Sequence, residues 1–362
     1  MSRRESQTAS TLRPLAAIML FFALLTASAD CRADATVLLY HRFGEDRYPT
    51  TSVPAAAFVR QMDWLAENGY RVVDLADIVD SIEAGRPVAD KTVAITIDDD
   101  YRSLYTVAWP VFRRHGYPFT VFVYGEATDR GYRDFLSWRQ VEEMAAAGVA
   151  FANHGYAHPH FGMRPRGMGD EAYRQWIRAD LRRGAALIAE HTGQRSDLLA
   201  LPYGEYTAEV LAVAREEGYR AVFTQTPGAV SEHTDPMMIP REPILGRDWS
   251  TLDHFRAVLR RIDLPLAELR PGIEPFAGVL PERVGARVLS PGRFQEGSFM
   301  VYVSELGWRK AERDGDLYFR RGGEVLTERV NRIAVSAREK GSGREALRFW
   351  LVVGPSSVGG RE

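Results

Sequence analysis

Most of the chain alternates between two kinds of hydrophobic pattern. Short runs of β-branched and apolar residues predict buried strands, and the stretches between most of them carry apolar residues at helical spacing. Glycine ends several of these stretches, as Gly69 does after 58–67 and Gly218 does after 209–217, which is typical of helix C-termini. The predicted strands are 36–40, 71–75, 92–97, 119–123, 149–152, 198–201 and 220–224.

The repeated strand-helix-strand unit predicts a parallel sheet covered by helices. About seven such units over roughly 225 residues favour a closed (β/α) barrel, because such barrels typically run to ~250 residues. An open doubly wound sheet is the structural alternative. Neither Gly-x-Gly-x-x-Gly after a strand nor Gly-x-x-x-x-Gly-Lys occurs, so nothing in the sequence supports nucleotide binding.

The pattern changes near residue 263. Prolines at 265, 271, 275, 281 and 291 indicate a linker or a loop-rich entry to a second domain. Only short strand-like runs follow, at 298–303, 317–320, 331–335 and 348–353. We therefore predict a barrel domain over 36–262 and a smaller β-rich accessory domain over 263–362. Its aromatic residues, expected to be core residues rather than sugar platforms, are Phe299, Tyr302, Trp308, Tyr318 and Trp350.

Composition and charge narrow the possible partners. With 45% hydrophobic and 26% charged residues, the 362-residue chain has the composition of a folded globular protein. Its 46 basic and 48 acidic residues give a formal net charge of -2, so we expect no nucleic-acid partner and a ligand that is neutral or small. The single cysteine, Cys31, excludes an intramolecular disulfide and a multi-cysteine zinc site, so any metal must be bound by His and carboxylate side chains.

The first thirty-five residues have the pattern of a secretory signal peptide. Three arginines precede an apolar run over 15–25, and a signal-peptidase site of Ala-x-Ala form ends at Ala29, with a second ending at Ala35. The apolar run is shorter than the roughly 20 residues that a spanning helix needs, so an uncleaved anchor is the weaker alternative. We assign residues 1–35 to the signal and expect an exported protein, periplasmic or extracellular, with no stable membrane insertion after cleavage.

Three consecutive carboxylates, Asp98, Asp99 and Asp100, follow the predicted strand 92–97. Desolvation and mutual repulsion would keep them out of a barrel wall, so they are expected where the strand ends. In a parallel barrel the carboxyl ends of the strands form the active-site face. Because successive strand residues face opposite ways, Asp98 and Asp99 can serve one site only if the backbone is already turning there. A solvated Asp-rich turn is the alternative.

Two histidines follow the predicted strand 149–152. His154 and His158 are four residues apart, so on one helical turn they would face the same way, at a ligand spacing for one metal ion. Pro159 prevents that turn from extending far. With one Asp, the pair would give three protein ligands. A third feature, Pro202-Tyr203-Gly204, follows the predicted strand 198–201 and by itself reads as an ordinary turn.

Together these clusters resemble the polysaccharide deacetylases with a NodB-homology domain, the fourth family of carbohydrate esterases. The first family motif, Thr-Phe-Asp-Asp-Gly, is matched by residues 96–100, and the second, His-(Ser/Thr)-x-x-His-Pro, by residues 154–159. The resemblance covers about 37–262 and implies a distorted (β/α) barrel. It implies that Asp98 is the general base and that a metal triad is formed by Asp99, His154 and His158.

The resemblance also implies a divalent metal and a glycan substrate. We expect Zn2+, with Co2+, Ni2+ or Mn2+ as alternatives, acting on a metal-bound water and the acyl carbonyl. The backbone N–H of Tyr203 would help to bind the oxyanion. The residues expected at the substrate are Pro202, Tyr203, Arg241 and His41.

Several positions depart from the family pattern. Asp100 replaces a glycine and, as an extra carboxylate, is expected to raise the pKa of its neighbours. Gly155 replaces the hydroxyl residue of the second motif, and Ala200 stands where an Arg usually pairs with the base. Arg241 could supply that charge or could be a surface residue.

No residue is assigned to the family's Leu-x-His motif, so the general acid is unassigned. His254 is a weak candidate, and three residues after the first strand are candidates in principle: His41, Glu45 and Asp46. We expect removal of N-acetyl groups from an N-acetylglucosamine-containing polysaccharide, such as an exopolysaccharide, peptidoglycan or a chitin-like polymer. The alternatives are an O-acetyl glycan esterase that uses the same metal site and a catalytically silent carbohydrate-binding protein.

Overall fold

A curled sheet of parallel strands forms the larger part of the fold. The computed structural model describes residues 34–354, and in it the strand order is β10-β1-β5-β6-β7-β8-β9, with β4 beside β5. The strands are β1 (Thr36–Tyr40), β4 (Arg71–Val72), β5 (Thr92–Asp98), β6 (Thr120–Val123), β7 (Ala150–Asn153), β8 (Leu198–Ala200), β9 (Ala221–Phe223) and β10 (Glu242–Pro243). The sheet is a curled half-barrel, which confirms the predicted distorted (β/α) barrel.

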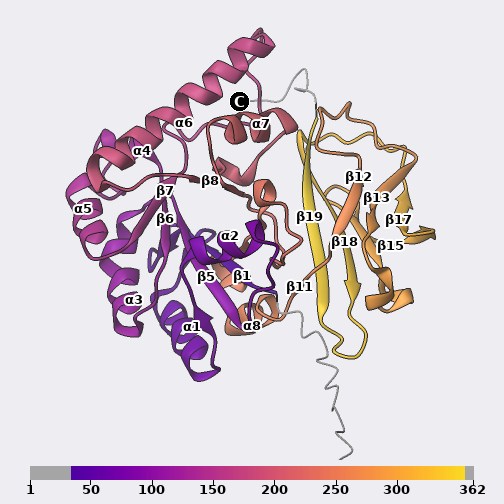
Figure 1. Ribbon diagram of the computed structural model, residues 1–362, viewed down its shortest axis with the longest axis horizontal. Coiled ribbons are helices and arrows are strands. Elements are labelled where there is room, and N and C mark those ends of the chain that lie inside the picture. Colours follow the sequence, from indigo (N-terminus) through magenta and orange to yellow (C-terminus); the bar gives the residue numbers. More distant parts are fainter. Residues whose placement is uncertain (1–33, 355–362) are drawn as a thin grey trace, which may run out of the picture. The chain divides into compact units, whose positions relative to one another are not determined.

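Both faces of this sheet are covered, as expected for parallel strands. Every residue of β1 and β5 is buried. Leu38 and Ile95 pack into one hydrophobic cluster, and Val37 and Ala94, which point the opposite way, pack into another. Figure 1 shows helices along the outside of the sheet. They are α1 (Ala55–Glu67), α2 (Leu75–Glu83), α3 (Trp109–His115), α4 (Gly125–Asp129), α5 (Trp138–Ala146), α6 (Asp170–Thr192), α7 (Ala208–Glu216) and α8 (Leu252–Val258).

One predicted strand, 71–75, is wrong in its second half. Only Arg71 and Val72 pair with β5, and α2 already begins at Leu75. Asp74 has the extended backbone of a residue preceding a helix, which ends the strand. A short parallel pair, β2 (Arg42–Phe43) and β3 (Ser52–Val53), also forms after β1.

Two β-sheets follow the barrel, where a β-rich domain was predicted, and their strands pair antiparallel except that β11 runs parallel to β19. One has the order β11-β19-β18-β14-β15 and the other β12-β13-β17-β16. The strands are β11 (Ile262–Asp263), β12 (Leu266–Arg270), β13 (Arg283–Val288), β14 (Met300–Val303), β15 (Gly307–Lys310), β16 (Glu312–Asp314), β17 (Leu317–Arg321), β18 (Val330–Arg338) and β19 (Glu345–Val353). The proline-containing segment predicted to be a linker or domain entry thus contributes β12 and β13. Of the aromatic residues, Phe299, Tyr318 and Trp350 are core residues, whereas Trp308 is 42% exposed.

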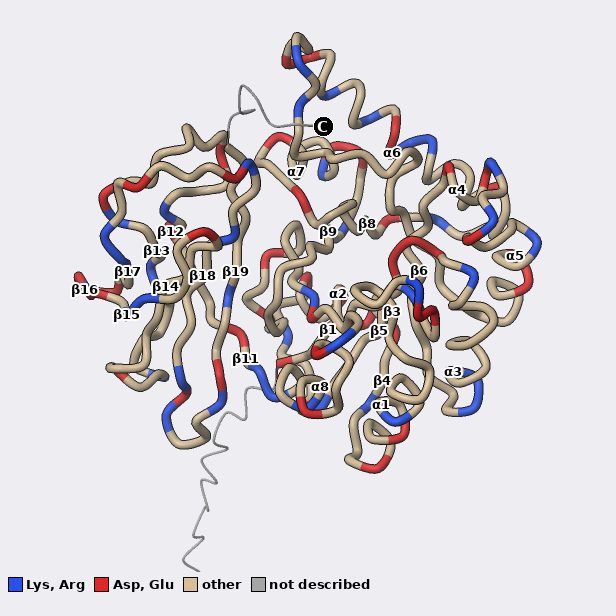
Figure 2. The backbone as a smooth tube through the Cα atoms, turned by 180° about the vertical axis from the view of Figure 1, so that it is seen from behind, with Lys and Arg blue, Asp and Glu red and all other residues tan. Residues whose placement is uncertain are grey.

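The antiparallel strands pack directly on the barrel. The backbone N–H of Leu351 on β19 donates to the Tyr206 hydroxyl (3.0 Å), and Leu351 and Val353 join a hydrophobic cluster with residues of α6 and α7. From residue 34 onward the described chain forms one compact unit. Charged residues of both signs are interspersed along both parts (Figure 2).

The predicted signal residues 1–33 lie outside the described residues. Asp34 and Ala35 lie inside them and belong to the fold. Ala35 is fully buried, and its backbone exchanges two hydrogen bonds of 2.8 Å with Val230. Among residues 34–354, no helix combines the length and the apolar character needed to cross a membrane.

Candidate metal centre

Asp98 and Asp99, at the end of β5, reach the same edge of the sheet because the chain turns between them. Asp98 is the last residue of β5, and Asp99 has a φ of 70°. This fulfils the condition set by strand alternation. In the described chain, four of the eight non-glycine residues with positive φ lie in the loops of this site. These four are Asp99, Asp100, His158 and Tyr203. Such backbone conformations cluster at functional sites because the surrounding contacts hold them in place.

Asp98 is paired with a fully buried arginine. Arg241 Nη1 and Nη2 donate to the two carboxylate oxygens of Asp98 at 2.6 and 2.7 Å, and both side chains are 0% exposed. Arg241 Nε also donates to the Thr224 carbonyl (2.9 Å). Burial alone would raise the pKa of Asp98, but the Arg241 guanidinium and, after it, His154 hold that pKa below its ordinary value. Arg241 is therefore neither a surface residue nor in reach of a substrate, and it lies beneath Asp98.

Asp99, His154 and His158 bring one ligand atom each to a common point, all within 4.8 Å of one another. Asp99 Oδ1 lies 3.4 Å from His154 Nε2 and 3.1 Å from His158 Nε2. Two ligands of a tetrahedral zinc, each about 2.0–2.1 Å from the ion, lie about 3.3 Å apart. Burial opposes ionisation of Asp99, but the two histidines hold its pKa well below the ordinary value.

The bonding state of these atoms fits a divalent metal. Asp99 Oδ1 and His154 Nε2 are buried without a hydrogen-bond partner in the described chain. His154 Nδ1 lies 2.8 Å from the Ala200 carbonyl oxygen. A carbonyl can only accept, so Nδ1 carries the proton and the Nε2 lone pair faces Asp99. Buried polar atoms left unpaired are costly unless a ligand binds them, and here both point to the same place.

The predicted helical turn between the two histidines is wrong: residues 154–158 form a loop after β7. Gly155 and His158 both have positive φ, which an α-helix does not contain. The Asp180 carboxylate on α6 holds the loop by accepting the backbone N–H of Tyr156 (2.8 Å) and of Ala157 (2.9 Å). A Cβ at position 155 would lie 2.8 Å from Asp180 Oδ1. The glycine that departs from the family motif therefore makes room for this carboxylate.

Asp100 points away from the other two carboxylates. Its oxygens accept from the Tyr124 backbone N–H (2.9 Å) and from the Thr128 hydroxyl. Burial raises the pKa of Asp100 to about 7. The pKa values of Asp98 and Asp99 nevertheless both lie below the ordinary value, because Arg241 and His154 lower the first and the two histidines lower the second. The raised pKa is that of Asp100 itself.

Tyr203 lies in a short turn, Pro202–Gly204, directly after β8. Pro202 is buried, and Tyr203 is 42% exposed with a φ of 58°. The Tyr203 ring stacks on His160 at 3.7 Å between centroids and meets His158 edge-on at 4.7 Å. His160 is held in turn by Glu205 (3.0 Å). The third sequence feature therefore reaches the metal cluster.

The candidates for the general acid differ in their burial and in their contacts. His41 follows β1, is 9% exposed and has a buried Nδ1 without a hydrogen-bond partner among the described residues. Burial lowers its pKa, and the nearby charges of Asp99 and Asp98 oppose that shift. His254 lies on α8 against Trp249, with ring centroids 5.1 Å apart, and outside the cluster. Of the two acidic candidates, Glu45 is paired with Arg42 and Asp46 is exposed.

Comparison with known proteins agrees with this geometry. The sequence profile of the family described as polysaccharide deacetylase matches residues 85–222. A Bacillus subtilis (strain 168) protein assigned to the polysaccharide deacetylases, YxkH, is 28% identical over 200 residues, covering 55% of this chain and 67% of that protein. Residues 85–222 form a domain of the polysaccharide deacetylase family. The Asp-His-His cluster is consistent with a divalent metal site of that family, and the metal is not identified.

Two further deacetylase relatives carry a substrate in their names. The poly-beta-1,6-N-acetyl-D-glucosamine N-deacetylase of Escherichia coli (strain K12) is 28% identical over 213 residues, covering 49% of this chain. The match spans only 31% of the length of that protein. The enzyme of the same name from Staphylococcus aureus (strain MRSA252) is 23% identical, covering 59% of this chain and 72% of its own length.

Solved deacetylase structures share the fold. IcaB from Ammonifex degensii superposes with a TM-score of 0.53 at 26% identity, covering 63% of this chain and 96% of that chain. Streptococcus pyogenes deacetylase PplD superposes with a TM-score of 0.53 at 21% identity, covering 59% and 93%.

Sequence reasoning missed the residues that hold this site. Asp180 lies in the middle of α6, and a carboxylate within a helix has no local signal that it binds another loop's backbone. Asn153, the last residue of β7, also went unnoticed, although its Oδ1 accepts the Gly155 N–H (2.9 Å). The one available signal was the glycine at position 155, which left the loop without the family's hydroxyl brace.

Proposed function

We propose that the protein is a metal-dependent hydrolase that removes N-acetyl groups from an N-acetylglucosamine-containing polysaccharide. The observation that carries the proposal is the convergence of Asp99, His154 and His158 beside a buried carboxylate, Asp98, that is kept ionised by Arg241. The names of the E. coli and S. aureus relatives make a β-1,6-linked polymer the first substrate to test. The signal-like residues 1–35 support action outside the cytoplasm, in the periplasm or beyond the cell.

The residues have distinct parts in this proposal. Asp99, His154 and His158 would hold the divalent ion, which when bound lowers the pKa of water and polarises the acyl carbonyl. Asp98 takes the proton from the attacking water. Its Oδ2 lies 3.8 Å from His154 Nε2, so the base faces the ligand cluster. Arg241 positions Asp98 through a bidentate contact, which fixes the carboxylate plane.

Two further groups complete the reaction. Tyr203 adopts a positive φ in the turn after β8 and its ring contacts His158, which supports a role for its backbone N–H at the cluster. We assign it to the developing oxyanion, as in other acyl-transfer sites. His41 is a buried imidazole whose pKa is influenced by the charges of both Asp99 and Asp98, and its Nδ1 has no partner among the described residues. We assign it to protonation of the leaving amine.

The test is incubation of the purified protein, supplied with Zn2+, Co2+, Ni2+ or Mn2+ in turn, with β-1,6-linked and β-1,4-linked N-acetylglucosamine oligosaccharides. Equal amounts of acetate and free amine are expected. Acetate without amine from O-acetylated glycans would instead show an esterase. Neither product across the panel would leave a binding protein and refute the hydrolase.

Two variants distinguish the role of the metal ligands from that of the proposed base. Asp98→Asn should keep its metal content and lose turnover, whereas His154→Ala should lose both. His191→Ala is the matched control, because His191 contacts Glu142 and Trp138 and lies outside the cluster, and it should keep both. Full activity of Asp98→Asn would remove the base assignment. Metal content unchanged in His154→Ala would remove the metal centre.

A further inference from the structure

One face of the sheet formed by β11-β19-β18-β14-β15 is only partly covered by the barrel. Side chains alternate along β19, so Trp350 and Val352 enter the core of the β-rich part, while Leu351 and Val353 pack on the barrel. Nearer the start of β19, this second face and the barrel are no longer in full contact. A cavity of about 430 Å³ lies there, between this sheet and α8 with the segment before it.

The sheet wall of this groove carries a row of aromatic residues. In register, Trp308 on β15 lies opposite Tyr302 on β14, and Ala334 on β18 lies between Tyr302 and Phe349 on β19. Tyr302 contacts both aromatic neighbours, with ring centroids 5.0 Å from Trp308 and 5.7 Å from Phe349. Trp308 and Phe349 line the cavity, and Trp308 keeps 42% of its surface exposed. An indole left this exposed and braced by two other rings is a rigid, preformed contact face.

The opposite wall carries a second exposed tryptophan. Trp249 lies in the short helix Arg247–Ser250, which follows β10, and it is 44% exposed. Trp249 and His254 line the cavity from the barrel side. Since β10 runs parallel to β1, the segment after β10 leaves the sheet at the edge where the metal centre lies. Trp249 therefore follows a strand that ends at the same edge of the sheet as the metal centre, and it also lines the groove.

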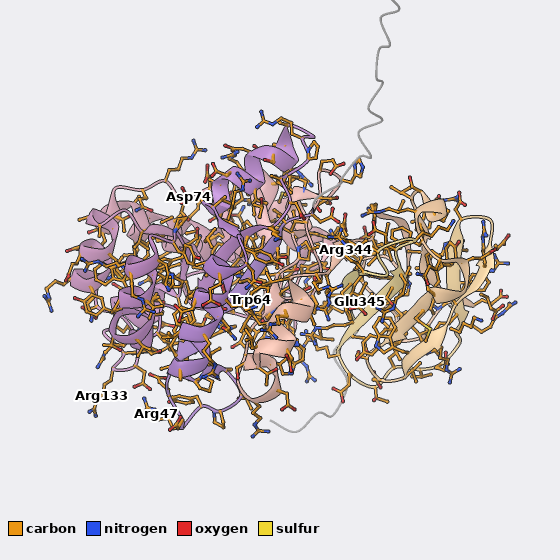
Figure 3. The ribbon with its side chains drawn as sticks, turned by 90° about the horizontal axis from the view of Figure 1, so that it is seen from below. Arg47, Trp64, Asp74, Arg133, Arg344 and Glu345 are labelled. Carbon is orange, nitrogen blue, oxygen red and sulfur yellow. The ribbon has the colours of Figure 1, made fainter. Side chains whose placement is uncertain are left out.

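Most charges that line the groove are paired with one another, and Arg338, which also lines it, donates to the Gly343 carbonyl (3.3 Å). Arg261 donates to Glu242 (2.6 Å) and to Glu345 (3.0 Å), so the main cation of the groove is neutralised. Glu345 is the first residue of β19 and lies where the sheet meets the barrel (Figure 3). Two hydroxyl residues, Ser298 and Ser336, also line the wall. The groove thus combines aromatic faces with polar groups that compensate one another, which suits an uncharged ligand with many hydroxyl groups.

We propose that this groove binds an uncharged stretch of a glycan chain, with Trp308 and Trp249 stacking on sugar rings. The inference rests on the proposed function, because it assigns the groove to the same polymer that reaches the metal centre. None of the residues lining the groove belongs to the metal centre. A strongly charged segment would have to compete with the contacts that Arg261 already makes to Glu242 and Glu345, and a wholly apolar one would leave the serine hydroxyls and paired charges facing it.

The first experiment measures binding without turnover. Full-length Asp98→Asn protein is titrated with a β-1,6-linked N-acetylglucosamine hexasaccharide and disaccharide, followed by tryptophan emission and calorimetry. In that background Trp308→Ala should weaken hexasaccharide binding about five- to tenfold, and Trp308→Phe should weaken it less. Trp249→Ala should act in the same direction. Val325→Ala is the control, because Val325 is 68% exposed on the β-rich part and lies outside the groove.

The second experiment measures turnover with the native base. Trp308→Ala should raise KM about five- to tenfold for the hexasaccharide, with kcat unchanged and with the disaccharide unaffected. Trp308-dependent binding without any acetate release would leave the groove in place and refute the proposed activity. Normal turnover, together with a hexasaccharide affinity that neither tryptophan substitution changes, would refute glycan binding in the groove.

Other occupants give different results. If a second copy of the chain fills the groove, Trp308→Ala will change the sedimentation coefficient and leave glycan affinity unchanged, which overturns the proposal. If residues 1–33 fill it, a chain starting at Asp34 will show altered tryptophan emission with no response to the hexasaccharide, which also overturns it. Thermal unfolding midpoints equal to that of the parent protein are required of each variant.

Discussion

Replacing Arg241 by methionine tests the contact on which the proposed base depends. Both members of the Arg241–Asp98 pair are 0% exposed and share two hydrogen bonds of 2.6 and 2.7 Å. Removing one partner of such a pair leaves a buried carboxylate uncompensated, at a cost of about 3–5 kcal/mol. The free energy of unfolding of a typical domain is only about 5–15 kcal/mol. Arg241→Met should therefore lower the stability of the protein severely.

A double-mutant cycle separates this cost from simple loss of packing. Asp98→Asn leaves Arg241 charged and unpaired, so it should also destabilise the protein, but the double variant Asp98→Asn/Arg241→Met buries no charge. The summed losses of unfolding free energy in the two single variants should therefore exceed the loss in the double variant by at least about 1 kcal/mol. Guanidinium chloride unfolding measures all four proteins in EDTA, so that metal binding does not contribute.

The same pair makes a kinetic prediction. Arg241 has no exposed surface, so it cannot contact substrate, and its loss should lower kcat while KM changes little. Arg241→Lys keeps the charge but loses the bidentate fork, so its kcat should lie between those of the parent and Arg241→Met. Unfolding free energies that add within about 0.5 kcal/mol, or an Arg241→Met variant with full kcat, would refute the assignment of Arg241 as the group that holds Asp98.

Three other outcomes follow from the structure. Asp180→Asn can accept only one of the two N–H groups of the histidine loop, so metal affinity by chelator competition should fall about tenfold or more, and unchanged affinity would contradict the bracing role. At Glu305 burial opposes ionisation, but hydrogen bonds, first from the Thr327 backbone, lower the pKa to about 2. Its stabilising contribution is therefore present above about 4.5 and lost as the pH falls toward 2, so Glu305→Gln should flatten the pH dependence of unfolding in that window, and an unchanged slope would argue against it. Because Asp34 and Ala35 are packed into the fold, N-terminal sequencing of the exported protein should find cleavage after Ala29, and a mature chain starting at residue 36 would contradict this.

The sequence was sufficient to predict where these strands end and which side chains lie at their ends. The predicted strand 36–40 is β1, and the predicted strand 92–97 ends one residue before β5 does. Hydrophobic runs that stop at carboxylates or histidines mark a sheet edge, so the ligand cluster could be anticipated. Its partners could not. Asp98 and Arg241 are 143 residues apart, and their contact depends on β10 pairing with β1 and β1 with β5. The choice between a buried partner and a surface arginine needed that topology.

The histidine pair shows how a correct grouping can rest on a wrong local structure. A spacing of four residues suits a helix, yet Gly155 and His158 adopt positive φ and the side chains converge from a loop. The spacing constrains which atoms can meet but not the backbone path between them. That path is decided by Asp180, which contacts the loop from another element and whose position no local pattern reveals.

Two departures from the family motifs are compensated by groups from elsewhere in the fold, and this bears on whether the barrel is catalytically silent. The arginine missing at Ala200 is replaced by Arg241, while the Ala200 carbonyl orients His154. The hydroxyl missing at Gly155 is replaced by the Asp180 carboxylate. A barrel that had lost its activity would have no physical reason to keep an ionised, fully buried Asp98, since an uncompensated buried charge costs several kcal/mol and a compensated one still favours replacement by apolar residues. The retained pair therefore favours a working base over a relic.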